Sequence, residues 1–504
     1  MSSKIYTSAL QGLNSVLVEV EADILGGLPK TLIVGLPDTA VSEASERVRS
    51  AIKNSQLEFP NRRYTVNLAP ADIKKEGPSY DLPIAISILA CTKQLDFDFE
   101  STLFIGELSL DGSLRPVNGI LSVVQLAKER GIKNIFLPKD NANEACLIPG
   151  PCIFAGNNLN QVVEHLNGKK IIASHYYDWK NEEDFDDYEL DMCYIKGQEH
   201  VKRALEIAAS GHHNVILTGP PGSGKTLLSK AVASILPKMS LEESLEVTRI
   251  YSVSGLLSAK EPLISKRPFR SPHHSASSAS LVGGGRIPRP GEISLAHRGV
   301  LFLDEFSEFS RSVLESLRQP LEEGAITVSR VHSTLSYPAK FILIAAQNPC
   351  PCGYASDLVK TCTCTPSQII KYQKKISGPL LDRIDLHVDV PRIKFEKLTD
   401  KKFTESSKDI RKRVEAAQEI QRRRFKNEKI IFNSEMNQKQ IMEFCQVDQK
   451  TNELLKNAVN QLHLSARSYH RILKLSRTIA DLAGSEEIKM EHVAEALQYR
   501  PKMQ

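Results

Sequence analysis

Long apolar runs are missing from this chain of 504 residues. The apolar stretch at 341–346 is much shorter than the roughly 18–20 residues that a helix needs to cross a bilayer. The first residues, MSSKIYTSAL, also lack the charged and apolar regions of a signal peptide. These absences exclude membrane and secreted proteins, so we expect a cytoplasmic protein without a membrane partner.

A strong excess of one charge is missing as well, because 65 Lys and Arg against 60 Asp and Glu give a net charge of only +5. The charge is unevenly distributed, however. Residues 392–429 contain 14 basic and 7 acidic side chains, whereas residues 181–191 contain seven acidic side chains and no basic one. A basic stretch is typical of a polyanion partner, although a solvated helix face has the same composition. The charge therefore permits a nucleic-acid partner without requiring one.

The length and the pattern along the chain predict several domains, because single cores stop growing near roughly 250–300 residues. Strand-like and helix-like segments alternate up to about residue 170 and again from 195 to 391, and the remainder is almost entirely helical. We expect an α/β multi-domain protein. Its predicted parts are an α/β domain at 1–167, an acidic linker at 168–194, a second α/β domain at 195–391, and a basic connector with a helical domain at 392–504.

The strongest chemical pattern is G-x-x-x-x-G-K-[ST] at 219–226, which follows a strand (NVILT) and opens a helix (LLSKAVASIL). Glycines let successive backbone N–H groups converge on phosphate oxygens, and the start of the helix favours negative charge. Lys225 can reach the β- and γ-phosphates, and the Thr226 hydroxyl can bind Mg²⁺. The expected nucleotide-binding residues here are Gly219, Pro220, Pro221, Gly222, Ser223, Gly224, Lys225 and Thr226.

Further residues follow in an order that fits nucleotide hydrolysis. The apolar strand GVLFL ends in Asp304 and Glu305, which we expect to hold Mg²⁺ through water and to polarise the attacking water. Asn348 ends a second apolar strand and could position that water. Arg383 and Arg467 are candidates for binding the γ-phosphate, although a single arginine is more often a partner in a surface ion pair.

From about residue 195 onward this layout resembles the AAA+ ATPases. The resemblance makes 219–226 the Walker A motif, Asp304 and Glu305 the Walker B motif, and Asn348 sensor 1. It makes Arg383 the arginine finger given to a neighbouring subunit and Arg467 sensor 2, which implies a ring, usually of six copies. The segment with Ile195 and Gln198 resembles the one that packs on adenine.

Two insertions resemble those of the Mg-chelatase-like branch of this family, and their short phrases are most similar to the YifB/ComM family. One insertion, before Asp304, contains RPFRSPHHSAS, and the other, ITVSRVHSTLSYPA, predicts a strand–turn–strand. In ring translocases of this branch such loops grip DNA in the pore, which makes Arg270, His273, His274 and Arg330 candidate DNA-binding residues. The alternative for Arg330 is a solvated hairpin tip.

Nine cysteines in a reducing compartment are not expected to form disulfides. Four of them form two C-x-C pairs that could supply four thiolates to a tetrahedral Zn²⁺ with a structural role. The alternative is four unliganded thiols in a loop, which would oxidise readily. The four are Cys350, Cys352, Cys362 and Cys364.

The first 167 residues resemble the Lon-protease-type domain of Mg-chelatase-like proteins, and Ser79 stands where the Lon nucleophile would be. A Ser–Lys dyad needs a lysine as its general base. That position falls at about Leu121, and Lys128 lies about two helical turns further on. We therefore expect a non-proteolytic scaffold or a DNA-handling platform.

The resemblance covers essentially the whole chain and implies a hexameric, ATP-driven motor on DNA. Such a helicase would promote branch migration and the integration of single-stranded DNA during natural transformation. The alternative enzyme is the ATPase subunit of a metal chelatase or a MoxR-like chaperone, which does not call for DNA. An ATP-dependent protease is the third class, and Leu121 argues against it.

Overall fold

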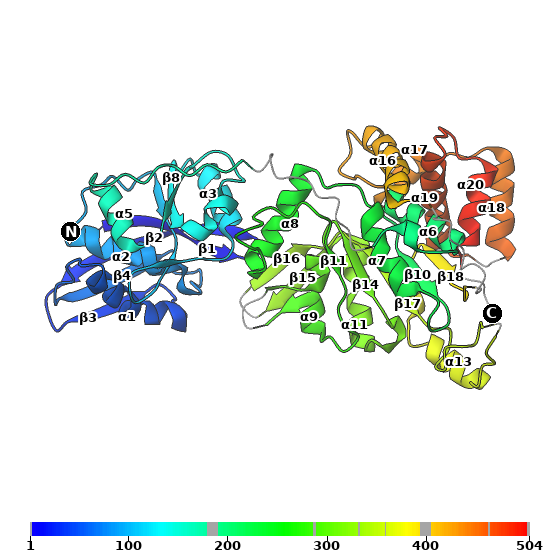
Figure 1. Ribbon diagram of the computed structural model, residues 1–504, viewed down its shortest axis with the longest axis horizontal. Coiled ribbons are helices and arrows are strands. Elements are labelled where there is room, and N and C mark those ends of the chain that lie inside the picture. The colour runs from blue at the N-terminus through cyan, green and yellow to red at the C-terminus, as the bar shows by residue number, and fades with distance from the viewer. Residues whose placement is uncertain are drawn as a thin grey trace. The chain divides into compact units, whose positions relative to one another are not determined.

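The computed structural model divides the chain into two compact units (Figure 1). Unit 1 comprises Met1–Asp184 and Leu241–Ile264, and unit 2 comprises Phe185–Ser240 and Ser265–Gln504. Most of the acidic stretch at 181–191 and the start of the basic connector, residues 394–404, lie outside the residues that the structure describes. Those residues are 3–178, 190–285, 289–330, 333–357, 359–393, 405–461 and 464–500.

Unit 1 is built on a seven-stranded mixed sheet with the strand order β3-β4-β2-β1-β5-β8-β9. β2 pairs antiparallel with both β1 and β4, and the remaining neighbours are parallel. The strands are β1 (Ser3–Gln11), β2 (Asn14–Leu25), β3 (Lys30–Val34), β4 (Arg63–Ala69), β5 (Thr102–Phe104), β8 (Asn134–Pro138) and β9 (Cys152–Gly156).

Helices of unit 1 bury their apolar faces in this unit's core. In α1 (Thr39–Asn54) the buried residues Val41, Ala44 and Val48 recur at helical spacing, and α2 (Asp81–Cys91) is buried along nearly its whole length. The remaining elements are the antiparallel pair β6 (Glu107–Leu108) and β7 (Leu114–Arg115), and the helices α3 (Ile120–Glu129), α4 (Ala142–Ala145) and α5 (Leu159–Leu166). β6 and β7 form a hairpin whose turn contains Asp111 and Gly112, and Gly112 adopts φ = 86°.

Unit 2 contains a five-stranded sheet with the order β11-β14-β17-β10-β18, in which every neighbouring pair is parallel. The strands are β11 (Phe269–Arg270), β14 (Val300–Leu303), β17 (Ile342–Gln347), β10 (Val215–Thr218) and β18 (Leu386–Asp389). Their nearly uninterrupted apolar sequences, such as VLFL in β14, suit strands covered on both faces. The predicted AAA+ α/β core with a parallel sheet and helices is confirmed.

The helices around this sheet include α6 (Glu199–Gly211), which contacts β10 and β18, and α7 (Lys225–Ile235), which contacts β17. The predicted strand–turn–strand is present as the antiparallel pair β15 (Ala325–Arg330) and β16 (Ser333–Pro338). Shorter elements of unit 2 are β12 (Gly283–Gly284), β13 (Arg289–Pro290), α9 (Ser278–Val282), α10 (Glu292–Leu295), α11 (Arg311–Ser316), α12 (Arg318–Glu323), α13 (Pro366–Gln373) and α14 (Gly378–Leu381).

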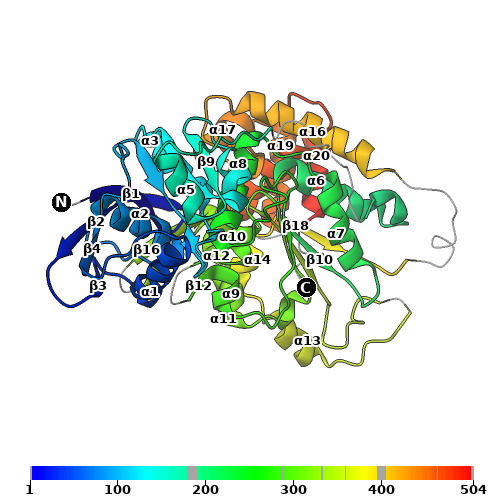
Figure 2. The same cartoon turned by 60° about the vertical axis from the view of Figure 1, so that its left-hand side comes forward.

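The C-terminal part is helical, as expected, and it packs on α6 (Figure 2). Its helices are α16 (Ser407–Arg424), α17 (Gln438–Phe444), α18 (Gln449–Gln461), α19 (Ala466–Leu482) and α20 (Met490–Gln498). Part of the predicted basic stretch lies in α16 and is used inside the fold. Arg411 donates to the carbonyl oxygen of Ser234, and Arg424 pairs with Asp481. These two cations therefore serve packing, whereas Arg423 is exposed.

Helix α8 (Leu241–Ser254) follows the phosphate-loop helix α7 in the chain, yet it belongs to unit 1. Arg249 donates to the carbonyl oxygen of Leu13 over 2.8 Å, to Ser122 Oγ over 3.0 Å and to Asn14 Oδ1 over 2.9 Å. The α/β domain predicted at 195–391 includes this segment. In the structure, residues 241–264 instead pack with unit 1.

The buried carboxyl of Glu144 completes this attachment. It accepts hydrogen bonds from the Ser252 hydroxyl and from the backbone N–H of Leu121, and burial raises its pKa. Ser252 Oγ in turn accepts from the backbone N–H of Gly119 over 3.0 Å. Because these groups are buried and mutually satisfied, α8 is fixed to α3 and α4 by direction-specific contacts as well as by apolar packing.

None of the helices within the described ranges combines the length and the apolar character that a bilayer crossing requires.

Replacing Arg249 with alanine removes three hydrogen bonds that hold α8 on unit 1. We expect the local free energy of opening of β1 and β2 to fall by ~2–3 kcal/mol, since each hydrogen bond from a charged donor contributes about 1 kcal/mol or more. Hydrogen exchange of the backbone amides measures this loss. Lys260→Ala, an exposed change in the same segment, is the matched control, and equal protection in both variants would contradict the role given to Arg249.

Candidate functional site

The order of the parallel strands brings three separate sequence motifs to one edge of the unit 2 sheet. The phosphate loop follows β10, Asp304 follows β14 and Asn348 follows β17, which lies between the other two. Gln347 is level with Thr218, and Ala345 is level with Leu303. Ligands bind beyond the carboxyl ends of such strands, where the strand order reverses. The motifs are therefore adjacent in space although 78 residues separate Thr226 from Asp304.

The phosphate loop has the backbone that a phosphate group requires. Gly222 and Gly224 adopt φ values of 74° and 89°, which side chains with a Cβ rarely adopt, so the loop curls ahead of α7. Lys225 Nζ lies inside the loop, where it donates to the carbonyl oxygens of Gly219 and Pro220 over 2.7 and 3.0 Å. The buried hydroxyl of Ser223 has no hydrogen-bond partner among the described residues. A cradle with an unsatisfied donor and a cation fits the phosphates of ATP.

Thr226 and Asp304 form the oxygen pair that a magnesium ion would use. The Thr226 hydroxyl donates to Asp304 Oδ2 over 2.7 Å, so both oxygens face the same small volume. Mg²⁺ prefers such hydroxyl, carboxylate and phosphate oxygens and retains several waters. When bound, Mg²⁺ would neutralise charge on the phosphates, while Thr226 and Asp304 fix its position.

Glu305 has an unusual backbone conformation, with φ = 52°, in the left-handed region. Such a conformation is uncommon for residues other than glycine and costs energy, so it is found mainly where the surroundings require it. Its backbone N–H donates to Asp304 Oδ1 over 2.9 Å. The chain thus turns away from the course of β14 directly after Asp304, the partner of Thr226, and Glu305 at this turn is the candidate general base for water.

The imidazole of His274 contacts this carboxylate directly, with Nδ1 lying 2.9 Å from Glu305 Oε2. His274 follows β11, the edge strand beside β14. Its ring also lies against that of His273, with centroids 4.1 Å apart, and His273 Nδ1 is 2.8 Å from Ser275 Oγ. The structure thus places His274, a candidate DNA-binding residue, at the ATP site.

The other two candidate DNA-binding residues are placed differently. Arg270 makes a bidentate ion pair with Glu292 over 2.6 and 2.7 Å. Arg330 ends β15 and pairs with Ser333 in the strand register, and its side chain lies outside the described residues.

Of the residues expected near the water and the adenine base, Asn348 contacts the phosphate loop and Gln198 contacts the segment after β18. Asn348 Oδ1 accepts a hydrogen bond from Lys225 Nζ over 3.3 Å, so sensor and loop residues are in direct contact. Gln198 donates to the carbonyl oxygen of Pro391 just beyond β18. Ile195 is buried in the unit 2 core.

Arg383 and Arg467 meet at one carboxylate that the sequence motifs did not identify. Both guanidinium groups donate to Glu322 in α12, Arg383 to Oε2 and Arg467 to Oε1. These hydrogen bonds, that of Arg383 first, hold the pKa of Glu322 below its usual value. Glu322 belongs to no motif and lies 61 residues from Arg383, so only the tertiary structure could reveal this shared partner.

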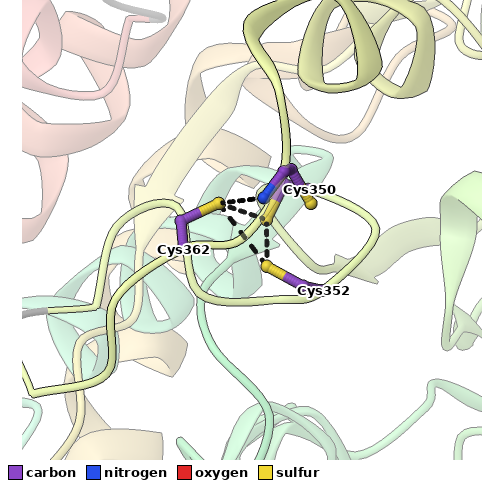
Figure 3. A group of neighbouring side chains, drawn as sticks. Cys350, Cys352 and Cys362 are labelled. Carbon is purple, nitrogen blue, oxygen red and sulfur yellow. Dashed lines mark hydrogen bonds between the residues drawn. The ribbon is translucent and has the colours of Figure 1, made fainter.

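The four clustered cysteines converge in space and could hold a metal ion. Figure 3 shows three of them, Cys350, Cys352 and Cys362. The four sulfur atoms all lie within 4.8 Å of one another, and the Sγ atoms of Cys350 and Cys352 are 3.3 Å apart. Hydrogen bonds from the backbone N–H groups of Tyr354 and Thr363 lower the pKa of the Cys352 thiol to about 5. A thiolate is the form that binds metal ions, so the cluster fits a soft or borderline metal.

The candidate residues of a Lon-type dyad make separate contacts. The Ser79 carbonyl oxygen accepts from Gly106 N–H over 3.0 Å at the start of α2. Leu121 is buried in α3, and Lys128 is exposed near the end of that helix. The lysine nearest to Ser79 in the chain, Lys75, is buried and donates to the carbonyl oxygen of Pro70.

Replacing His274 with phenylalanine keeps an aromatic ring but removes the contact with Glu305. We expect kcat for ATP hydrolysis to fall about tenfold, because the Glu305 carboxylate loses the side chain that orients it. This is smaller than the ~10²–10⁴-fold loss expected when a general base is removed altogether. KM for ATP should stay unchanged, since the described contacts of His274 include no phosphate-loop residue. His274→Asn, which retains a donor, should recover part of kcat, and His273→Phe is the control. Full kcat in His274→Phe would refute this positioning role.

Comparison with known proteins agrees with this geometry. The family described as magnesium chelatase, subunit ChlI, matches residues 191–398, its C-terminal part matches 404–500, and a further ChlI family matches 20–141. Competence protein ComM of Haemophilus influenzae is 44% identical over 98% of this chain and 97% of its own length. YifB of Escherichia coli is 43% identical over 99% of this chain and 97% of its own length. The magnesium-chelatase 67 kDa subunit of Heliobacterium mobile is 27% identical over 40% of this chain and 31% of its own length. The chain belongs to the Mg-chelatase-like ComM/YifB family, whose core is an AAA+ ATPase module.

Proposed function

We propose that this protein is a ring-shaped, ATP-hydrolysing motor that acts on DNA. Its helicase or branch-migration activity would promote the integration of single-stranded DNA during natural transformation and recombination. The observation that carries the proposal is that Lys225, the Thr226–Asp304 pair, Glu305 and Asn348 follow neighbouring strands at one sheet edge. They do so in a chain that matches a competence protein over 98% of its length.

Hydrolysis of ATP by this site follows from the roles that the residues can fill. The phosphate loop and Lys225 would bind the β- and γ-phosphates, and Asp304 with Thr226 would hold Mg²⁺. Glu305 would take the proton from the attacking water, and Asn348 would orient that water. Catalysis of this kind depends on positioning and charge stabilisation, which the shared sheet edge supplies.

The expected DNA contacts concern loops rather than the basic helix. We assign this role to the β15–β16 hairpin, which carries Arg330. We also assign it to the segment that begins with Arg270 at the end of β11 and continues through His273 and His274. The ion pair of Arg270 with Glu292 and the contact of His274 with Glu305 would have to rearrange if these side chains reached DNA directly. Arg330 is therefore the contact that we favour.

The ring assembly is part of the same proposal. An arginine that acts on a neighbour's ATP needs a fixed orientation, and Glu322 supplies a shared anchor for Arg383 and Arg467. A homo-hexamer would place Arg383 of each copy next to the ATP site of the adjacent copy.

We also propose that the four cysteines bind a structural Zn²⁺. Four sulfurs at a tetrahedral Zn–S distance of about 2.3 Å lie roughly 3.8 Å from one another. The separations of 3.3, 3.5 and 3.7 Å among Cys350, Cys352 and Cys362 are near that value. Since all four ligand positions are filled by thiolates, such a site would leave no position for a reactive water.

A second function is favoured by the match to magnesium chelatase subunits. The ATPase subunit of a metal chelatase, or a MoxR-like chaperone, would use the same ATP site without translocating DNA. Stimulation by DNA distinguishes these functions, because only the motor couples ATP turnover to nucleic acid.

We expect double-stranded or branched DNA to raise the ATPase rate of the purified protein several-fold. This stimulation should disappear as salt rises, since affinity for phosphates falls linearly on a log–log scale. Migration of synthetic four-way junctions should require ATP, and Glu305→Gln should bind ATP and DNA but move no junction. An ATPase rate that no single-stranded, duplex or branched DNA changes would favour the chelatase or chaperone function.

Replacing Glu322 with glutamine should lower the ATPase rate of the assembled protein about tenfold, as for loss of a positioning contact that acts on the transition state. ATP binding should persist, because Glu322 makes no described contact with the phosphate loop. Glu323→Gln is the matched control, since Glu323 accepts from Gln319 Nε2. An unchanged rate in Glu322→Gln would show that the shared anchor has no part in turnover.

A further inference from the structure

The cysteine cluster is a direct continuation of the sensor strand. β17 ends at Gln347, Asn348 follows, and Cys350 comes two residues later, fully buried. The same loop therefore begins with the residue that contacts Lys225 and continues into the first thiol of the cluster. A change in the position of Cys350 must move Asn348, because only Pro349 separates them.

The loop also lies against the phosphate loop at a second point. Gly353 adopts φ = 85°, and a Cβ built on it would come within 2.7 Å of Pro221 Cδ. That approach is closer than any side chain allows, so the backbone of Gly353 packs directly on Pro221. The cluster thus contacts the ATP site through two routes, Asn348 with Lys225 and Gly353 with Pro221.

The far end of the cluster is anchored as well. Thr365, immediately after Cys364, caps α13 and forms a capping box with Gln368. Tyr354 lies between the two C-x-C pairs, and the centroid of its ring is 5.6 Å from the guanidinium of Arg392. Arg392 follows β18, so both flanks of the cysteine loop are tied to unit 2. The thiols connect the two C-x-C pairs directly, since Cys362 Sγ lies 3.7 Å from Cys350 Sγ and 3.5 Å from Cys352 Sγ.

We propose that the four-cysteine site is a metal-dependent brace of the ATP site. Zn²⁺ bound by Cys350, Cys352, Cys362 and Cys364 holds residues 348–353 in place, and so keeps Asn348 and Pro221 in the geometry that binds nucleotide. Loss of the ion weakens nucleotide binding. This inference rests on the proposed zinc binding and adds a consequence that an isolated structural zinc site would not have.

The test begins with the full-length protein and two measurements. Mass spectrometry gives the zinc content, and Co²⁺ substitution reports thiolate ligation through its charge-transfer absorption. Titration with fluorescent N-methylanthraniloyl-ADP gives the nucleotide Kd. We expect one zinc per chain, its loss in Cys364→Ser and after chelation of the native protein, and a Kd about tenfold higher in both cases, as for loss of a shell that orients binding groups. Cys152→Ser, an exposed thiol of unit 1, is the control.

Gly353→Ala separates the brace from the metal site, because it leaves all four thiols in place. The added Cβ meets Pro221, so this variant should keep its zinc but bind N-methylanthraniloyl-ADP about tenfold more weakly. Gly484→Ala is the matched control, since Gly484 also has a left-handed φ, of 66°, but a Cβ there meets no atom within 4 Å.

The outcomes separate the two proposals. A wild-type protein without zinc or Co²⁺ binding would overturn the zinc site together with the brace. Zinc that is present, with an unchanged Kd after chelation and in Gly353→Ala, would overturn the brace and leave the structural zinc site standing. Chelation keeps the test decisive where Cys364→Ser does not fold.

Discussion

The hydrogen bond between the Thr226 hydroxyl and Asp304 depends on one constraint, the order of the parallel strands in unit 2. β17 lies between the strands that end in these two motifs, so Asn348 reaches Lys225 from the middle of the same edge. Parallel strands end on one side of the sheet, and their polar ends meet only when the crossovers place them as neighbours. This strand order also sets the positions of Glu305 after β14, of His274 after β11 and of the cysteine loop after β17.

Around this edge, the unit 2 fold uses charged groups mainly to fix elements to one another. Glu322 connects Arg383 with the C-terminal helix α19, which carries Arg467. Asp385, just before β18, accepts from Arg471 of the same helix over 2.9 Å. Burial raises the pKa of Asp385, but Arg471 and His213 outweigh it and keep the carboxyl ionised. Charged pairs therefore join the helical domain to the rest of unit 2, and the Asp385–Arg471 pair is the more buried of them. Removing one partner of that buried pair would leave the other charge unpaired.

Much of the fold could be predicted from the sequence, because local patterns carry it. Alternating and helical periodicities indicated the two α/β parts, the helical C-terminal part and the β15–β16 pair, and the glycine spacing identified the phosphate loop. The insertion of α8 into unit 1 could not be predicted, since its contacts join Arg249 to residues more than 100 positions away. Glu322 and the Glu305–His274 contact were missed for the same reason. No local pattern distinguishes these residues from other surface carboxylates and histidines.

The sequence by itself determined the chemistry: a phosphate loop, two carboxylates after a strand, a polar sensor and four thiols at metal-ligand spacing. Residue type and short spacing decide these properties, because a glycine turn or a C-x-C pair acts over a few residues. Only the tertiary structure decided which groups act together. It brought His274 to Glu305, two arginines to one glutamate, and the backbone of Gly353 onto Pro221. Such pairings depend on the long-range packing of strands and loops, which no local spacing encodes.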